Sequence, residues 1–378
     1  MSVVVVEGLG FVGSVMSLVC ANANNGDYAV IGVDLPKPES YWKICSLNEG
    51  TLPLRSSDPK VLSYYETAKK QGNFLATFDP IAYSYADVVI VDINLDVQKY
   101  SNKEGELIDF DVTLESFKKG IDVLAKHCKP EVLILIETTV PPGTCEQVVF
   151  PIIQRGFADR NLPTDLFKLG HSYERVMPGP NYIDSIESFY RVYSGVNNDS
   201  AVAIEKFLKT IIRTDNYPLT RLKNTNATEM AKVLENSYRA MNIAFIVEWS
   251  RFAEEAGVNL YEVINAIRMR ETHSNMMFPN IGVGGYCLPK DPLLASWASQ
   301  NFFNSSNALI QSEHGVRIND QMPFFAFNFF KKHIEGLGRK MKGLKVLLLG
   351  VSYRGDVGDT RYSPVELFCK LLASILPN

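Results

Sequence analysis

"SVVVVEGLGFVGSVMSLVCANANNGDYAVIGVDL" spans residues 2–35 and predicts a strand, a glycine-rich turn, a helix and a second strand. The run of four valines is typical of a strand that is buried on both faces of a parallel sheet. Gly8, Gly10 and Gly13 follow it in the pattern G-x-G-x-x-G. In this pattern the first glycine permits a tight turn, the second allows close approach to the backbone, and the third packs the helix on the strand. The segment therefore predicts an α/β fold.

The position of Asp34 indicates what the glycine turn binds. This residue lies 21 positions after Gly13, near the end of the second predicted strand. The amino terminus of the intervening helix favours a diphosphate, and a carboxylate here would accept hydrogen bonds from an adenosine ribose. The same carboxylate would repel a 2′-phosphate, so the pattern predicts NAD rather than NADP.

Further strand-like runs occupy residues 86–93, 132–138 and 189–196, and helical patterns such as 113–128 separate them. This alternation predicts a doubly wound, Rossmann-like parallel sheet over residues 1–197. Ligands bind such sheets beyond the carboxyl ends of the strands. We therefore expect ligand contacts from the loop segments "ETTVPPGT" (137–144) and "HSYERVMPG" (171–179).

Helical patterns dominate residues 198–340, which we predict to be a central domain. Residues 226–257 have a helical period without internal glycine or proline, and residues 302–338 contain a second long helical stretch. Lys232 and Asn236 are four residues apart and so share one helix face. Residues 344–376 again predict a strand, a turn and a helix, which indicates the beginning of a second α/β domain over residues 341–378.

Composition excludes several classes of partner. The 378 residues carry a net charge of −4, and no basic run or aromatic-basic stripe suggests a nucleic acid. The apolar start is interrupted by Glu7 and glycines and has no preceding basic residue, so we expect neither a signal peptide nor membrane insertion. The six cysteines form no CxxC or Cys/His cluster, so we expect no metal site and a cytoplasmic location with reduced thiols.

One cysteine has an unusual setting. Cys287 lies in "GVGGYCLPKD" (282–291), among glycines, a proline and charged residues, with little apolar side chain to bury it. A structural cysteine usually lies on an apolar face. The setting indicates an accessible thiol.

Taken in order along the chain, these motifs resemble the UDP-glucose/GDP-mannose dehydrogenase family, the nucleotide-sugar 6-dehydrogenases. "YERVMPG" is similar to the P-E-R-x-x-P-G form of the branch that oxidises UDP-N-acetylhexosamines, and "GVGGYCLPKD" is similar to the family's nucleophile motif. The other matching segments are "GLGFVG" (8–13), "KICSLNEGTLPL" (43–54), "ETTVPPGT" (137–144), "TEMAKVLENSYRAMNIAF" (228–245) and "KVLLLGVSYRGDVGDTRYSP" (345–364).

The resemblance implies a four-electron oxidation. The C6 hydroxyl of a nucleotide sugar would be oxidised to a carboxylate, with two hydrides passing to two NAD in succession. Cys287 would add to the intermediate aldehyde to give a thiohemiacetal, and the second oxidation would give a thioester that water hydrolyses. Lys232 would stabilise the alkoxide and oxyanion, with Asn236 as a hydrogen-bond donor. Glu174 and Asp291 would manage the hydrolytic water, which Thr139 would orient.

The resemblance also implies the binding residues. The expected cofactor contacts are Gly8, Gly10, Phe11, Val12, Gly13, Asp34, Thr139 and Lys290. The expected substrate contacts are Glu174, Arg175, Lys232, Asn236, Gly284, Gly285, Arg317 and Arg361, the arginines because they pair well with phosphate. The family's central domain supplies a dimer interface, so a homodimer is expected, and the product would be a polysaccharide precursor.

Two departures and several alternatives bear on this interpretation. "VDIN" (91–94) stands where the family usually has V-P-T-P, and "RMRETHSN" (268–275) matches the branch pattern only in part, so Arg268 and Arg270 are weak substrate candidates. The alternatives are a GDP-mannose 6-dehydrogenase, a non-catalytic or impaired homologue, and a 6-phosphogluconate or 3-hydroxyacyl dehydrogenase. The last class performs a single hydride transfer and needs no cysteine.

Overall fold

The computed structural model describes residues 1–307, 309–341 and 343–376. The chain forms two compact units: unit 1 comprises Met1–Leu95 with Thr113–Lys232, and unit 2 comprises Asp96–Val112 with Val233–Asn378. The three domains expected from the sequence stay a prediction. The last two of them include positions 308, 342, 377 and 378, which lie outside the described residues.

Unit 1 is built on an eight-stranded sheet in the order β10-β9-β8-β7-β4-β1-β2-β3. Every pairing is parallel except that of β8 with β9. The expected α/β class is confirmed, with this one antiparallel pair as a difference. Only the four-residue helix α6 lies between these two strands, and an antiparallel neighbour needs no long crossover connection. The strands are β1 (Ser2–Glu7), β2 (Tyr28–Val33), β3 (Phe74–Thr77), β4 (Val88–Val91), β7 (Leu133–Ile136), β8 (Lys168–His171), β9 (Val192–Gly195) and β10 (Thr220–Arg221).

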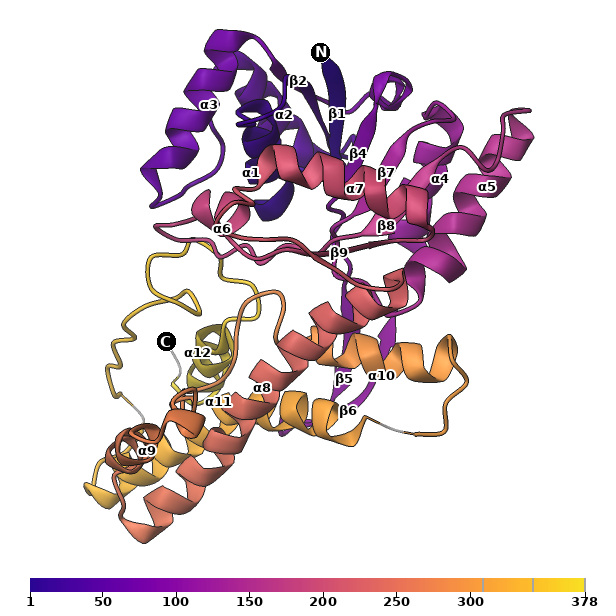
Figure 1. Ribbon diagram of the computed structural model, residues 1–378. Coiled ribbons are helices and arrows are strands. Elements are labelled where there is room, and N and C mark those ends of the chain that lie inside the picture. The colour runs from indigo at the N-terminus through magenta and orange to yellow at the C-terminus, as the bar shows by residue number, and fades with distance from the viewer. Residues whose placement is uncertain (308, 342, 377–378) are drawn as a thin grey trace. The chain divides into compact units, whose positions relative to one another are not determined.

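Alternation along the buried strands divides the core of unit 1 between the two faces of the sheet. Val4 and Val6 of β1 pack in one cluster with residues of α1, α3 and α7, while Val5 points to the other face. Figure 1 shows α1 and α3 together and α4 beside α5. The helices are α1 (Phe11–Ala21), α2 (Pro38–Glu49), α3 (Pro59–Gln71), α4 (Glu115–His127), α5 (Phe150–Asp159), α6 (Asp184–Glu187) and α7 (Asn198–Ile211).

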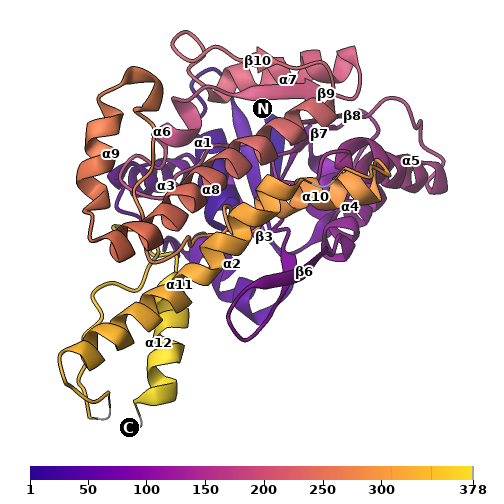
Figure 2. The same cartoon turned by 90° about the horizontal axis from the view of Figure 1, so that it is seen from below.

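Helices make up most of unit 2. The long helix α8 begins in unit 1 and continues into unit 2, and α11 contains Pro323. Both long helices agree with the sequence-based prediction. The antiparallel hairpin β5–β6, which the sequence analysis did not predict, lies beside α10 (Figure 2). The elements are β5 (Val97–Ser101), β6 (Leu107–Val112), α8 (Thr225–Ala256), α9 (Leu260–Arg268), α10 (Asp291–Asn301), α11 (Ile310–Gly336) and α12 (Pro364–Ile375).

The strand predicted within residues 344–350 is wrong. The described residues there form no strand, and Leu347 and Leu349 are 82% and 89% exposed. No strand of the described chain runs alongside to pair with this segment, and an extended segment needs such a partner for its backbone hydrogen bonds. The helix predicted after it is present as α12, which packs on α11.

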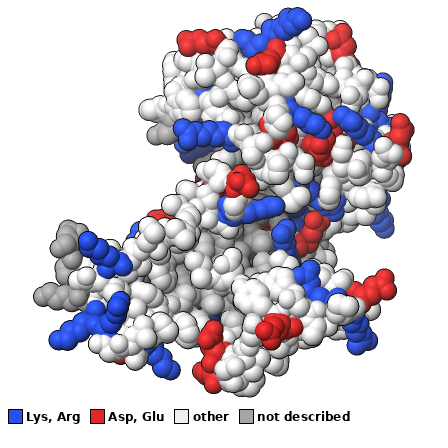
Figure 3. Space-filling model, turned by 90° about the vertical axis from the view of Figure 1, so that its left-hand side faces the viewer, with Lys and Arg blue, Asp and Glu red and all other residues white. Residues whose placement is uncertain are grey.

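Basic and acidic side chains are mixed over the face drawn in Figure 3. None of the helices within the described ranges has the length and apolar character that crossing a membrane requires. The cysteines all lie in the described ranges, and none forms a disulfide. No group of histidine, cysteine, aspartate and glutamate side chains suited to a metal ion was found among the residues that the structure describes.

Candidate active site

The glycine turn after β1 leaves room for a ligand at one position only. Gly8 has a φ of +99°, and a Cβ there would lie 2.5 Å from the carbonyl oxygen of Asp92. A Cβ on Gly13 would lie 1.9 Å from the carbonyl oxygen of Gly8, so the first turn of helix α1 packs directly on the glycine turn. A Cβ on Gly10 would meet nothing within 4 Å. This open backbone at the start of α1 fits a dinucleotide diphosphate.

Two further predicted cofactor residues, Phe11 and Val12, form the first turn of α1 and are partly buried. The carbonyl of Phe11 accepts a hydrogen bond of 2.5 Å from the hydroxyl of Tyr182. This bond ties the amino terminus of α1 to the loop that follows β8.

Asp34 lies directly after β2 and has a cationic neighbour. Lys43 Nζ is 2.8 Å from Asp34 Oδ2 and also donates to the carbonyl of Leu9 at 3.1 Å. Lys43 belongs to the "KICSLNEGTLPL" segment, so two segments that sequence analysis treated separately meet at the predicted ribose contact. The lysine reduces the negative potential that Asp34 presents to a ligand.

The "VDIN" departure lies beside the glycine turn. Asp92, in its second position, is partly buried, and its buried Oδ2 atom has no hydrogen-bond partner among the described residues. Burial raises the pKa of Asp92 well above its usual value. The carbonyls of Val91 and Ile93 accept from Thr138 Oγ1 at 3.1 and 2.9 Å. The segment is thus fixed to the loop after β7, where Thr139 is partly buried.

A buried polar cluster occupies the carboxyl ends of β7 and β8. Glu137 forms an ion pair with Arg191, and both are nearly inaccessible to solvent. His171 is fully buried at the end of β8. Burial, with Lys232 and Arg191 nearby, lowers its pKa to about 3, so the ring is neutral near pH 7. Sequence analysis missed Arg191 and His171, although His171 lies in a segment that it placed at a strand end and Arg191 lies in a strand-like run that it identified.

Glu174, Arg175 and Lys232 come together in unit 1. Lys232 Nζ donates to the carbonyl of Glu174 at 2.8 Å and lies 3.6 Å from Glu174 Oε1. Glu174 Oε2 also accepts from the backbone amide of Val176. Lys232 is 6% exposed, so its ammonium is held by defined partners and does not extend into bulk water.

A second group gathers in unit 2 around Cys287, whose side chain is exposed. The backbone amides of Lys290 and Asp291 donate to the carbonyl of Cys287 at 3.1 and 2.9 Å, which forms a turn leading into α10. Gly285 has a φ of +84°. A Cβ on Gly284 or Gly285 would come within 3 Å of Tyr353, so the close approach expected for a sugar is made here by a tyrosine.

Partly buried Asn236 and buried Lys290 and Asp291 form a hydrogen-bonded network next to the Cys287 turn. Asp291 Oδ2 accepts from Asn236 Nδ2 at 2.7 Å, and Oδ1 accepts from Lys290 Nζ at 2.8 Å. Lys290 Nζ also lies 4.5 Å from the centroid of the Tyr286 ring. The amine that sequence analysis assigned to a cofactor or substrate phosphate is therefore 2% exposed and paired within unit 2. Its contact with a phosphate stays a prediction.

Arg361 lies near the same loop. Its guanidinium makes a two-point contact with Asp359, at 2.9 and 2.8 Å, and lies 4.4 Å from the centroid of the Tyr286 ring. Its backbone carbonyl accepts from Gly285 at 3.0 Å. Tyr286 thus contacts both Lys290 and Arg361. Sequence analysis predicted these two residues as site residues but did not predict Tyr286.

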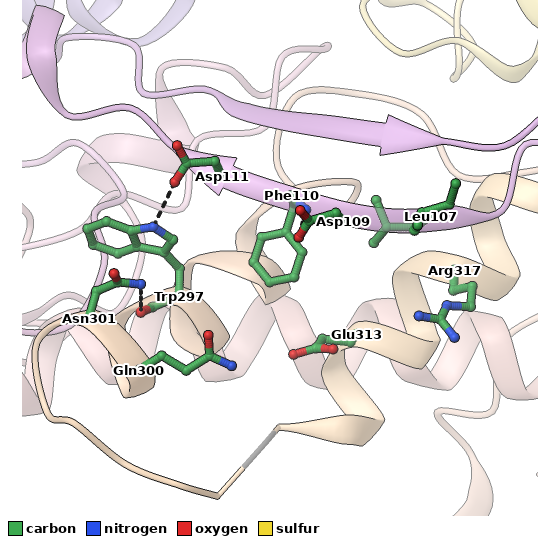
Figure 4. Close-up of a pocket in the computed structure, with 10 residues that line it drawn as sticks. Leu107, Asp109, Phe110, Asp111, Trp297, Gln300, Asn301, Glu313 and Arg317 are labelled. Carbon is green, nitrogen blue, oxygen red and sulfur yellow. Dashed lines mark hydrogen bonds between the residues drawn. The ribbon is translucent and has the colours of Figure 1, made fainter.

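Arg317 lies elsewhere in unit 2. It lines a pocket of about 290 Å³ formed by β6, α10 and α11 (Figure 4). Trp297 Nε1 donates to Asp111 at one end of this pocket, and Arg317 is 3.9 Å from Glu106. No other residue of the predicted site lines it. The structure thus assembles most predicted residues into one group in each unit, while Arg317 lines a pocket of unit 2 that contains none of the others.

Comparison with known proteins agrees with these features. Residues 1–212 match the model of the UDP-glucose/GDP-mannose dehydrogenase family NAD-binding domain, and residues 226–320 match that of the family's central domain. The chain belongs to the UDP-glucose/GDP-mannose dehydrogenase family, and it is a nucleotide-sugar dehydrogenase family enzyme with an NAD-binding domain.

Several similar proteins are named as UDP-N-acetyl-D-mannosamine dehydrogenases. The chain is 30% identical over 374 residues to a UDP-N-acetyl-D-mannosamine dehydrogenase of Pyrococcus horikoshii, covering 98% of this chain and 80% of that one. It is 28% identical to a UDP-N-acetyl-D-mannosamine dehydrogenase of Campylobacter jejuni, and the match covers 97% of this chain and 83% of that one. A solved structure of UDP-D-ManNAc dehydrogenase from P. horikoshii superimposes with a TM-score of 0.81 at 27% identity, covering 99% of this chain and 81% of that one. The solved structure of a UDP-N-acetyl-mannosamine dehydrogenase from Staphylococcus aureus superimposes with a TM-score of 0.78 at 25% identity, covering 99% of this chain and 80% of that one.

Proposed function

We propose that this enzyme oxidises the C6 hydroxyl of a UDP-N-acetylhexosamine to the uronic acid, with transfer of two hydrides to two NAD. The observation that carries the proposal is the exposed Cys287, which lies in a glycine-rich turn that leads to the buried Asp291. The similarity to UDP-N-acetyl-D-mannosamine dehydrogenases of P. horikoshii and C. jejuni supports the sugar class. A relative from Ralstonia nicotianae, 26% identical, is named as an NDP-N-acetyl-D-galactosaminuronic acid dehydrogenase, so the test below includes epimers of the sugar.

NAD, when bound, would supply the hydride acceptor; its diphosphate would lie at the open backbone of Gly10, and Asp34 would contact its adenosine ribose. In the first oxidation the C6 hydroxyl loses its proton as the hydride leaves, so negative charge develops on oxygen. Lys232, held by the Glu174 carbonyl, would stabilise that charge. A cation in a site shielded from water is more effective than one in bulk solvent, because its field is less screened.

The second oxidation would use Cys287. An aldehyde is a poor hydride donor, and addition of the Cys287 sulfur to its carbon forms a C–S bond and a tetrahedral thiohemiacetal. Loss of the second hydride leaves a thioester on Cys287. Water then attacks the thioester carbon, the C–S bond breaks, and the acid and the thiol are released. Glu174 and Asp291 would manage this water, Thr139 would orient it, and Asn236 would donate a hydrogen bond to the oxyanion.

We further propose a cytoplasmic homodimer that supplies a polysaccharide precursor. The dimer is supported by exposed aromatic side chains on α8, namely Phe245, Trp249 and Phe252. The precursor role and the location follow from family analogy alone.

The test is NADH release with a panel of UDP- and GDP-sugars. The expected result is two NADH per sugar, fastest with UDP-N-acetylmannosamine or its epimers. Turnover of GDP-mannose alone would refute the sugar class. One NADH per sugar would refute the four-electron reaction, and no turnover would favour an impaired homologue.

A further inference from the structure

The ring of Tyr173 contacts two cations of the predicted site. It follows β8 by two residues and is 2% exposed. The centroid of its ring is 5.5 Å from Lys232 Nζ and 5.0 Å from Arg175 Cζ. Both distances are within the range in which a cation is attracted to the face of an aromatic ring, and the attraction is strongest where water is excluded.

The hydroxyl of Tyr173 makes a second contact with one of these cations. It accepts a hydrogen bond of 3.0 Å from Arg175 NH2, while NH1 of the same guanidinium donates to the carbonyl of Tyr190 at 2.6 Å. The guanidinium also lies 5.7 Å from the ring of Phe189. Tyr173 therefore helps to fix both the position and the plane of the Arg175 side chain.

This tyrosine is a departure from the family pattern. In the P-E-R-x-x-P-G form the position of Tyr173 is a proline, which has neither an aromatic face nor a hydroxyl. The two residues that follow, Glu174 and Arg175, match the form. The change thus falls at a position whose side chain contacts both Lys232 and Arg175 here.

We propose that Tyr173 is a positioning residue: its ring holds the Lys232 ammonium, and its hydroxyl holds the Arg175 guanidinium that the substrate contacts. The inference rests on the proposed function, because Lys232 and Arg175 take their roles from it. It assigns separate duties to the two parts of one side chain, and substitutions can separate them.

Tyr173→Phe removes the hydroxyl and keeps the ring. A hydrogen bond to a charged group is worth enough that KM for the nucleotide sugar should rise about tenfold, while kcat stays within about twofold. In an Arg175→Ala background the same substitution should change KM by less than about twofold, since the partner is gone. Tyr173→Leu removes the ring as well, and kcat should then fall about tenfold.

The control is Tyr193→Phe. Tyr193 is also 2% exposed and donates one hydrogen bond, of 2.6 Å, to Glu205. Its loss should alter the thermal midpoint without moving KM. If Tyr173→Leu does not fold, the inference is tested by Tyr173→Phe alone and by the double-mutant cycle of Tyr173→Phe with Arg175→Ala. Equal effects of Tyr173→Phe with and without Arg175, or an unchanged KM, overturn the inference.

Calorimetric binding of UDP-N-acetylmannosamine separates this failure from that of the proposed function. If the wild type binds and oxidises the sugar but Tyr173→Phe binds it equally well, only the role of Tyr173 is wrong. If the wild type neither binds nor oxidises any sugar of the panel, the proposed function and the role of Tyr173 both fall.

Discussion

The side-chain amide of Asn236 donates a hydrogen bond of 2.7 Å to the carboxylate of Asp291, and this bond joins α8 to the first residue of α10. The other oxygen of Asp291 is paired with Lys290 at 2.8 Å. Asp291 is fully buried and Lys290 is 2% exposed. In such a place an ionic group depends on its partner, because water cannot replace it.

Asp291→Asn should therefore lower the free energy of unfolding by about 3–5 kcal/mol, since it leaves the Lys290 ammonium buried without a counter-charge. Urea unfolding measures this. The double variant Lys290→Met/Asp291→Asn removes both charges and should recover most of the stability without recovering turnover. If the single variant is as stable as the wild type, the pair does not support the Cys287 turn.

Cys287→Ser should separate the two oxidations. A serine hydroxyl is far less ionised than a thiol at neutral pH, so addition to the aldehyde should fail or stall. We expect at most about one NADH per active site and a steady rate to the acid that is lower by several orders of magnitude. Stopped-flow absorbance at the NADH band measures the stoichiometry.

Two further variants serve as comparisons for Cys287→Ser. Cys45→Ser changes another exposed cysteine and should leave the rate unaltered. Lys232→Ala should instead slow both oxidations, because negative charge develops on oxygen in each, and a lost donor of this kind costs about 3–4 kcal/mol. Two NADH per sugar from Cys287→Ser at nearly the parental rate would exclude the thioester route.

Cofactor choice should depend on the Asp34–Lys43 pair. Asp34 facing a 2′-phosphate should favour NAD over NADP by about 1–3 kcal/mol, and Lys43 at 2.8 Å reduces that margin. Lys43→Ala should widen the ratio of kcat/KM for NAD to that for NADP, whereas Lys37→Ala, at an exposed position nearby, should not. Equal kcat/KM for the two cofactors in the wild type would disprove the role of Asp34.

Stability should fall as the pH rises through neutrality. Burial raises the pKa of Glu7 from 4.5 to about 8, against a hydrogen bond with Tyr83 that lowers it. Between these values the folded protein holds a proton that the unfolded chain has lost, so the free energy of unfolding falls by about 1.4 kcal/mol per pH unit. His171, with its pKa lowered to about 3, changes stability only below pH 6.5.

Denaturant unfolding at pH 6.5 and pH 8 measures the effect of Glu7. The wild type should lose about 2 kcal/mol more over this interval than Glu7→Gln, which cannot titrate. Glu49→Gln, at an exposed position, is the control and should behave like the wild type. Equal slopes for the wild type and Glu7→Gln would mean that Glu7 is ionised when folded.

The exposed aromatic residues of α8 should lie in a subunit interface. Phe245, Trp249 and Phe252 are 52%, 47% and 61% exposed, and adjacent ring centroids are 6.1 Å apart. Trp249→Lys should shift sedimentation from dimer to monomer at micromolar protein, because it places a charge on an apolar contact. Leu62→Lys, on α3 of unit 1, is the matched control and should remain dimeric. A monomeric wild type would contradict the proposal.

The amino-acid sequence by itself determined the parts of this protein that depend on local pattern. The valine run of β1, the three glycines and the uninterrupted period of α8 each predicted their element, because burial on a sheet or along a helix imposes a period on the side chains. The motifs around Cys287 and around Lys232 and Asn236 are local as well, and they contributed to the resemblance to the family.

The tertiary structure alone decided how charged and aromatic side chains distant in sequence are paired. Lys290 is bound to Asp291 inside unit 2, Tyr173 contacts Lys232 across 59 positions of sequence (232 − 173), and Arg317 lies in a pocket apart from the other predicted residues. The strand predicted within 344–350 failed because a strand requires a neighbour to satisfy its backbone. A side chain's partner is set by packing between segments, which local periodicity does not encode.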